Sequence, residues 1–165
     1  MNKPLYHLSI GSNLDDRLSQ INHAKRLISS ELGTIIAESK IYETQPWGFD
    51  DQPWFLNQVI AVASTIEAEG ALNKIKHIET ETGRQPGEKW QARHIDIDIL
   101  LHGEEVINTE ALTIPHAHFH ERNFALIPLM EIASQSVHPV LHQTVEELYL
   151  ECRDTGEVYI FNADE

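Results

Sequence analysis

The sequence predicts an α+β fold with the element order βαββαβ and a C-terminal extension. Four segments have the apolar alternation or the β-branched composition of strands, and apolar residues recur at helical spacing in two other segments. Segments rich in glycine, proline and polar residues separate these elements. The 165 residues, 41% of them hydrophobic, suffice for a single core, so we expect one domain over residues 1–165.

The four strands are expected at 5–10, 34–43, 55–66 and 93–101. The fourth, "RHIDIDILL", has an unusual composition for a strand, because successive side chains point to opposite faces. Its alternation predicts one apolar face and one acidic face. The apolar face would hold Ile95, Ile97, Ile99 and Leu101, and the acidic face Asp96 and Asp98.

Two helices complete the βαββαβ pattern. The first follows the aspartate pair at 15–16, either member of which can cap it, and it ends near Gly33. The second is expected at 67–82. In the extension, residues 121–133 resemble a helix interrupted near Pro128, and a short helix and a terminal strand follow. This order is that of a ferredoxin-like sandwich.

The composition limits the classes of partner. A net charge of −14 repels nucleic-acid backbones, so no nucleic-acid partner is expected. No apolar run approaches the roughly 18 residues of a membrane span, and the N-terminus lacks the pattern of a secretory signal. A single cysteine, Cys152, fits a reducing compartment. The sequence therefore predicts a cytoplasmic protein.

The carboxylates of Asp96 and Asp98 form a candidate metal site. Residues two apart on a strand are separated by about 6.5 to 7 Å, at roughly 3.3 Å per residue. Two carboxylates at this spacing can hold one hard cation or a pair of them. A solvated strand face is the alternative. The loop just upstream carries Arg84, Lys89 and Arg93, and cationic groups beside a magnesium site are typical of phosphoryl transfer.

Two other segments carry candidate side chains. His116, His118 and His120 would share one face if their segment were extended, which would suggest zinc, but no fourth ligand is identifiable. We expect instead that one histidine, with Arg122, contacts phosphate. Phe55 and Asn57 share a strand face, and if Phe55 and Phe124 converge they could enclose a flat heterocycle that Asn57 hydrogen-bonds. Core packing is the alternative for each aromatic residue.

Taken together, the chain resembles the 6-hydroxymethyl-7,8-dihydropterin pyrophosphokinase family of folate biosynthesis. The matching motifs span most of the chain in the family's order. They are "IGSNLDDR" (10–17), "YETQPWGFDDQPWFLN" (42–57), "IETETGR" (78–84), "RHIDIDILL" (93–101) and "LTIPHAHFHERNFALIPLMEIA" (112–133).

The resemblance implies that the pyrophosphoryl group of ATP passes to the pterin's hydroxymethyl oxygen and that AMP is released. It implies two Mg²⁺ ions on Asp96 and Asp98. It also implies roles for further side chains: Arg84 and Arg93 in catalysis, Glu79, His116 and Arg122 in ATP binding, Thr44, Trp47, Phe55, Asn57 and Phe124 in pterin binding, and Trp90 in a mobile loop.

The sequence departs from the family pattern at Pro86 and Ala111, where many relatives carry arginine. These departures affect loop closure and turnover rate more than the metal site. Two other functions use the same residues, namely a metal-dependent phosphohydrolase and a non-catalytic pterin- or nucleotide-binding protein. The resemblance also implies a functional neighbour, dihydropteroate synthase.

Overall fold

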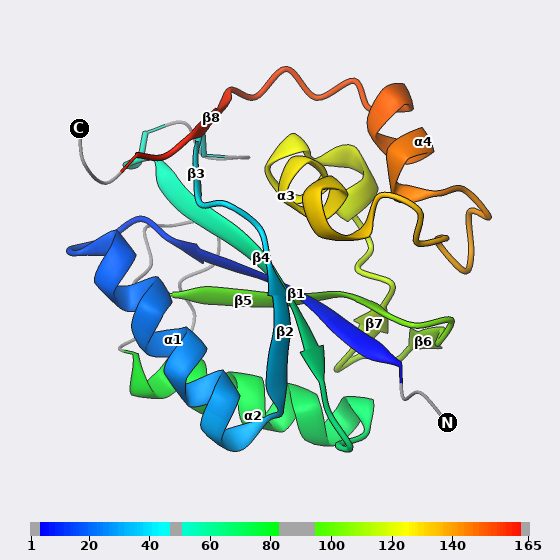
Figure 1. Ribbon diagram of the computed structural model, residues 1–165, viewed down its shortest axis with the longest axis horizontal. Coiled ribbons are helices and arrows are strands. Elements are labelled where there is room, and N and C mark those ends of the chain that lie inside the picture. Colours follow the sequence, from blue (N-terminus) through cyan, green and yellow to red (C-terminus); the bar gives the residue numbers. More distant parts are fainter. Residues whose placement is uncertain (1–3, 47–50, 83–94, 163–165) are drawn as a thin grey trace.

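The computed structural model describes residues 4–46, 51–82 and 95–162, and its centre is a six-stranded antiparallel sheet (Figure 1). The strands follow the order β5-β1-β4-β3-β8, and β2 also pairs with β4. Their bounds are β1 Leu5–Ser12, β2 Thr34–Glu38, β3 Tyr42–Thr44, β4 Phe55–Ala63, β5 Asp96–His102 and β8 Val158–Ile160. A separate hairpin contains β6 Ile107–Asn108 and β7 Thr113–Ile114.

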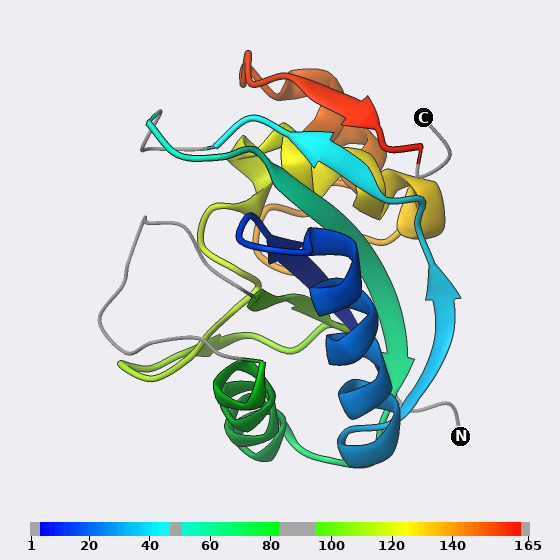
Figure 2. The same ribbon diagram turned by 90° about the vertical axis from the view of Figure 1, so that its left-hand side faces the viewer.

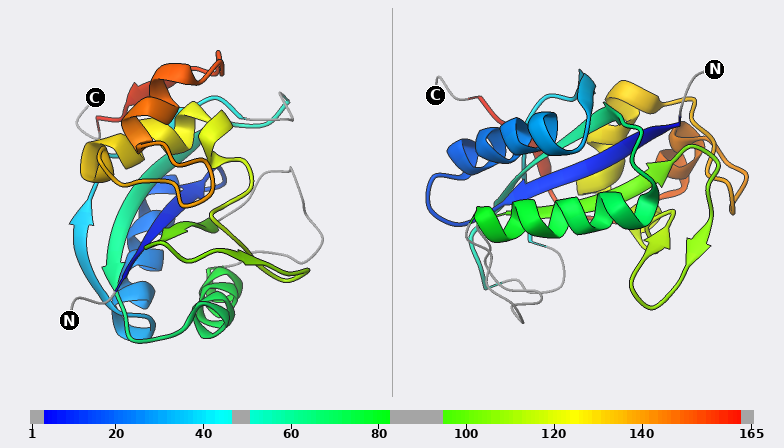
Figure 3. Two further views of the ribbon diagram at one scale, coloured as in Figure 1. Left: turned by 90° about the vertical axis from the view of Figure 1, so that its right-hand side faces the viewer. Right: turned by 90° about the horizontal axis from the view of Figure 1, so that it is seen from below.

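Helices cover both faces of the sheet. On one face α1 (Arg17–Glu31) and α2 (Ala68–Glu81) lie side by side, as the view from below in Figure 3 shows. On the other face α3 (Asn123–Ala133) packs on β4 and β3, with α4 (Val145–Glu151) beside it (Figure 2). In the sheet, β5, β1 and β4 lie side by side, and β2 and β3 together occupy the position of the second predicted strand. With α1 and α2 this is the ferredoxin-like arrangement, so the predicted fold class is confirmed.

The sequence pattern explains the packing of α1 and α2. Their buried residues recur at helical spacing and form one core with the strands: Ile21, Ala24 and Ile28 from α1, and Ala71, Ile75 and Ile78 from α2. Asp16 caps α1 by accepting a hydrogen bond from the backbone N–H of Ser19 at 3.1 Å. Gly33 follows α1 as expected, and a Cβ there would lie only 2.2 Å from the carbonyl oxygen of Ala63. Close backbone approach therefore requires this glycine.

The strand predicted at 34–43 is divided into β2 and β3. Both pair with β4, and Ser39 lies between them. The Ser39 hydroxyl accepts the backbone N–H of Val59, and the Ser39 carbonyl accepts the side-chain amide of Gln58. The Ser39 N–H also donates to the Val59 carbonyl at 2.9 Å, so these bonds hold the kink between β2 and β3 against β4, which pairs with both short strands.

The prediction that Leu101 lies on the apolar face of β5 is wrong. The pairing of β1 with β5 shifts register between His7 and Leu8, which pair with Leu101 and Ile99. Leu100 is thus the extra residue of a β-bulge. Ile95, Ile97 and Ile99 join the core beneath α1 and α2, whereas Leu100 and Leu101 join the core beneath α3 and α4.

The C-terminal extension differs from its prediction at one point. Helix α3 is not interrupted, because it runs from Asn123 to Ala133 with Pro128 inside it. Pro128 is buried, and the packing of α3 outweighs the loss of one helical hydrogen bond. The predicted short helix and terminal strand are α4 and β8. Among the described residues, no helix is long and apolar enough to cross a membrane.

Candidate active site

The strand register brings the predicted site residues onto one face of the sheet. Gly11 of β1 pairs with Asn57 of β4 on one side and with Asp96 of β5 on the other. Ser9, two residues earlier, pairs with Val59 and Asp98. Directly paired residues of neighbouring strands share a face, and Val59 belongs to the core beneath α3. Asn57, Asp96 and Asp98 therefore share the face that α3 covers in part.

Gly11 leaves space between the amide and the carboxylates. A Cβ at this position would lie 2.6 Å from Oδ1 of Asn57 and 3.4 Å from Cδ1 of Phe55. The first distance is shorter than van der Waals contact, so any side chain at position 11 would displace Asn57. The sequence analysis identified "GSN" only as part of a motif and missed this role.

Asn57 is held by Thr44. Its Nδ2 donates a hydrogen bond to Oγ1 of Thr44 at 2.5 Å, and both residues are buried. Thr44 pairs with Phe55, so three of the residues assigned to the pterin occupy adjacent positions on β3 and β4. Phe55 is half-buried. The arrangement presents an aromatic ring and a fixed amide on one face.

Glu79 supports the strand that carries both aspartates. It lies in α2, is 6% exposed, and its Oε2 accepts the backbone N–H of Ile97 at 2.9 Å. Ile97 separates Asp96 from Asp98, so a carboxylate from the opposite layer contacts the backbone between them. The sequence analysis assigned Glu79 to ATP binding only, and nothing in the helical periodicity predicts this backbone bond.

His116 lies beside Asp98. Its backbone N–H donates to the carbonyl of Leu100 at 3.0 Å, which attaches the histidine segment to β5. Its Nδ1 accepts the backbone N–H of His118 at 3.1 Å, and its Nε2 lies 4.0 Å from Oδ2 of Asp98. Burial, then the charges of Arg122, His118 and His120, lowers the pKa of His116 to about 4. The neutral ring therefore carries its proton on Nε2, toward Asp98.

Arg122 is the buried cation of the site. It is 7% exposed and is the N-cap residue of α3. Burial lowers the pKa of its guanidinium, and the carboxylates of Asp98 and Asp96 act in the opposite direction. The guanidinium carbon lies 5.7 Å from the ring centroid of Phe124, which is half-buried at the start of α3. Arg122 thus lies within electrostatic range of both aspartates.

The three histidines do not form the extended face on which a zinc site would depend. His120 lies within a 3₁₀ turn, Phe119–Glu121, that begins directly after His118. His118 is exposed, and His120 packs edge-on against Phe119 and His138, with ring centroids 6.4 and 6.1 Å away. Within the described ranges, no group of three His, Cys, Asp or Glu side chains could hold a metal ion. Trp47, Arg84, Trp90 and Arg93 lie outside the described residues, and their roles remain predictions.

The fold and the site together define a class: a ferredoxin-like protein whose open sheet face combines a carboxylate pair, a buried arginine and a fixed amide. The family model described as 7,8-dihydro-6-hydroxymethylpterin-pyrophosphokinase (HPPK) matches residues 7–134. The chain therefore belongs to the HPPK family, and the resemblance noted from its motifs is confirmed.

Individual relatives agree with this assignment. A 2-amino-4-hydroxy-6-hydroxymethyldihydropteridine pyrophosphokinase of Aquifex aeolicus is 40% identical over 141 residues, which cover 86% of this chain and 88% of the relative. The protein of the same name from Haemophilus influenzae is 38% identical and covers 81% of this chain and 84% of its own length.

Solved structures show the same fold. A Plasmodium falciparum HPPK-DHPS structure matches with a TM-score of 0.77 over 91% of this chain, at 18% sequence identity. This chain covers only 45% of that one. Likewise, it covers 18% of the folic acid synthesis protein fol1 of Pneumocystis carinii, to which it is 39% identical over 134 residues.

Proposed function

We propose that this protein transfers the pyrophosphoryl group of ATP to the hydroxymethyl oxygen of 6-hydroxymethyl-7,8-dihydropterin in folate biosynthesis. Besides membership of the family, one observation carries the proposal. Gly11 pairs with both Asn57 and Asp96, so the amide to which we assign the heterocycle and the carboxylate to which we assign a metal flank one glycine on the same face of the sheet. A pterin bound at Asn57 would therefore lie next to a phosphate chain bound at Asp96.

The pterin site is assigned to β3, β4 and the start of α3. Phe55 and Phe124 supply the ring contacts, and Asn57 hydrogen-bonds the edge of the pterin. Thr44 holds the Asn57 amide. We assign Trp47, which lies outside the described residues, to the same site. The hydroxymethyl group then extends past Gly11 toward Asp96.

The metal site is assigned to Asp96 and Asp98. Their carboxylate oxygens are the ligand type that Mg²⁺ prefers, and both residues are half-exposed, which leaves room for water and phosphate oxygens to complete the coordination of two ions. When bound, Mg²⁺ neutralises the charge of the triphosphate. Other side chains of the protein bind the pterin and the rest of ATP.

ATP binding is assigned to His116, Arg122 and Glu79. Neutral His116 can donate a hydrogen bond from Nε2 to a phosphate oxygen without adding charge, while Arg122 supplies a permanent positive charge. Glu79 acts through the backbone of Ile97. Arg84 and Arg93 are assigned to charge stabilisation during transfer.

The reaction requires the protein to position its two substrates and does not require it to form a covalent bond with either. The hydroxymethyl oxygen forms a bond to the β-phosphorus of ATP, the bond from that phosphorus to the oxygen of the α-phosphate breaks, and AMP leaves. The hydroxyl proton passes to solvent water in the same step. No enzyme-bound phosphoryl intermediate is needed.

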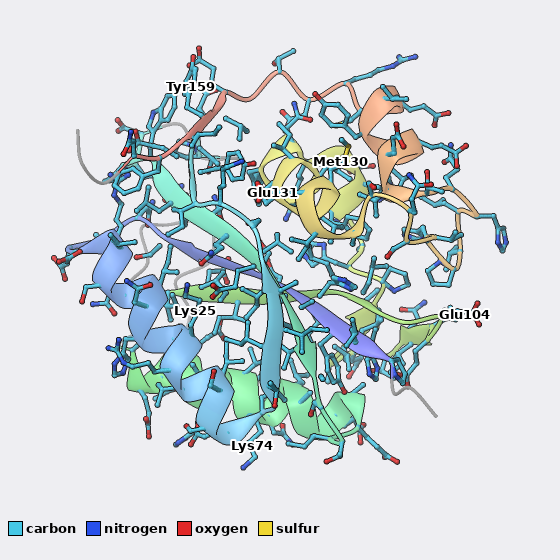
Figure 4. All side chains as sticks on the ribbon, viewed as in Figure 1. Lys25, Lys74, Glu104, Met130, Glu131 and Tyr159 are labelled. Atoms are coloured by element: carbon cyan, nitrogen blue, oxygen red, sulfur yellow. The ribbon has the colours of Figure 1, made fainter. Side chains whose placement is uncertain are left out.

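Product analysis tests the proposal. The wild type, Asp96→Asn and Asp98→Asn are incubated with ATP and Mg²⁺, with and without 6-hydroxymethyl-7,8-dihydropterin. We expect AMP only when pterin is present, and a loss of at least about 100-fold in each variant, because carboxylates that bind catalytic metals are lost. The exposed Glu104, labelled in Figure 4, offers a matched control, and Glu104→Gln should keep full activity.

Other outcomes identify the alternative functions. Release of phosphate or ADP regardless of pterin would identify a phosphohydrolase. Pterin binding without AMP would identify a non-catalytic binding protein.

The pathway context extends the proposal. A pterin diphosphate is the substrate expected for dihydropteroate synthase, and the HPPK-DHPS structures that share this fold support that enzyme as a functional neighbour. We place the reaction in the cytoplasm, in agreement with the single cysteine, and assign it to one domain over residues 1–165.

A further inference from the structure

The C-terminal residues 154–160 contact β3 and the start of α3, two of the elements that carry the proposed pterin-binding side chains. Figure 2 shows this segment, with β8 beside β3 and close to α3. The match to the family ends at residue 134, so the segment lies outside it. We call residues 154–160 the C-terminal clasp.

The first contact joins Asp154 to the start of α3. Oδ2 of Asp154 accepts the backbone N–H of Asn123 at 2.8 Å, and the Asp154 carbonyl accepts Nδ2 of Asn123 at 2.7 Å. Its Oδ1 accepts the backbone N–H of Gly156 at 2.8 Å, which fixes the carboxylate. The first N–H groups of a helix have no partner within the helix, so this carboxylate, 31 residues away in sequence, caps α3.

The start of α3 carries two residues of the proposed site. Arg122 is the N-cap residue, and Phe124 is the second residue of the helix. Because Asp154 bonds to both the backbone and the side chain of the intervening Asn123, it restrains the helix between them. A change in this cap would move the proposed ring contact and the buried cation together.

The second contact joins the clasp to β3. Strand β8 pairs with it in antiparallel register, with Val158 opposite Thr44. Beyond the strand, the backbone N–H of Gln45 donates to the carbonyl of Glu157 at 3.0 Å. Farther along, the Tyr159 ring, labelled in Figure 4, stacks on Trp54 with centroids 6.2 Å apart. The clasp thus restrains the backbone of Thr44, whose hydroxyl holds Asn57.

We propose that the C-terminal clasp sets the separation between α3 and β3 at the pterin site, with Asp154 as its positioning residue. The inference rests on the proposed function, because it assigns Phe124 to one side of the pterin and Thr44 with Asn57 to the other. A rigid support matters here, since displacement of a binding group by about 1 Å can weaken recognition strongly. Asp154 contacts neither reacting group and acts through Asn123 and the strand.

The test compares two helix caps. Asp154→Ala removes the cap of α3, and Thr144→Ala removes that of α4, where Oγ1 of Thr144 accepts the N–H of Glu147 at 3.1 Å. Binding of 6-hydroxymethyl-7,8-dihydropterin is measured by calorimetry in the presence of Mg²⁺ and a non-hydrolysable ATP analogue. We expect the pterin Kd to rise about tenfold in Asp154→Ala, from the loss of charge-assisted hydrogen bonds, and by less than about twofold in Thr144→Ala. Asp154→Asn retains one carbonyl acceptor for the Asn123 N–H but loses the charge and the second acceptor, so it should recover only part of the affinity.

Amide hydrogen exchange of the complete, ligand-free protein supplies a readout independent of function. In Asp154→Ala we expect faster exchange at Ala125, Leu126 and Thr44, and in Thr144→Ala no change at these amides. Equal effects of the two variants on pterin Kd, or unchanged exchange in Asp154→Ala, would overturn the clasp. If the wild type does not bind pterin, the proposed function fails, and exchange alone then decides whether the clasp restrains these elements.

Discussion

Gly11 is the residue at which the two halves of the proposed site meet. An alanine Cβ there would lie 2.6 Å from Oδ1 of Asn57. Overpacking of this kind costs about 1 to 3 kcal/mol, so we expect Gly11→Ala to raise the KM for pterin by about 5- to 150-fold. The KM for ATP should change by less than about twofold, because the clash lies on the amide side. Steady-state kinetics with each substrate varied in turn measures both values.

The control for this substitution is Gly70→Ala. There the added Cβ would lie 2.9 Å from Cγ2 of Ile66, so it also meets a close contact, but one outside the proposed site. Alanine also favours the helix in which Gly70 lies. An unchanged pterin KM in Gly11→Ala, or an equal rise in Gly70→Ala, would contradict the role assigned to Gly11.

Individual residues also show what the sequence can and cannot predict. Residues two apart on a strand share a face whatever the strand pairs with. The sequence could therefore predict that Asp96 shares a face with Asp98, and Phe55 with Asn57. The position of Gly11 between these pairs depends on strand register, which local periodicity does not contain. The bond from Glu79 to Ile97 depends likewise on how α2 packs on β5.

Among the elements, α3 is joined to the kink between β2 and β3 by Glu131, labelled in Figure 4. Its Oε1 accepts the hydroxyl of Tyr42 at 2.9 Å, and its Oε2 accepts the backbone N–H of Lys40 at 2.5 Å. Burial, then the bond to Glu131 and its charge, raises the pKa of Tyr42 to about 12. The tyrosine therefore remains a donor at neutral pH.

We expect Glu131→Ala to lower the free energy of unfolding by about 1 to 3 kcal/mol, because the tyrosine hydroxyl and the backbone N–H lose a charged acceptor. Urea denaturation measures the change. Tyr42→Phe should lower it by about 1 kcal/mol, and the double variant by less than the sum, because the two residues share one bond. Strict additivity would show that the bond does not couple α3 to the sheet.

The sequence predicts a helix or strand correctly where its local pattern determines the structure, and fails where contacts with other elements determine it. Helices α1 and α2 and the strands β1 and β4 follow from spacing alone. The kink at Ser39 and the bulge at Leu100 depend on hydrogen bonds and register with neighbouring strands. The continuity of α3 through Pro128 depends on its burial against the sheet and α4, which a proline rule does not include.

For the whole molecule, buried histidines predict how stability depends on pH. Burial lowers the pKa of His7, and burial with the charges of His120 and His142 lowers that of His138. Both side chains are less than one-tenth exposed. Between the folded pKa and the ordinary value of 6.5, the unfolded chain binds more protons than the folded one. The free energy of unfolding therefore falls as pH decreases below 6.5.

His138→Asn isolates one of these contributions. Nδ1 of His138 accepts the backbone N–H groups of Val140 and Leu141 at 3.2 and 3.0 Å, and an asparagine oxygen can take the same place without titrating. We expect the loss of stability from pH 7.5 to 5.5, measured by urea denaturation with a chelator present, to be smaller in this variant by about 1 kcal/mol. The change in overall charge repulsion across this range is common to both proteins, since a net charge of −14 changes almost equally in each. Parallel pH profiles would show that His138 takes up its proton equally in the folded and unfolded states.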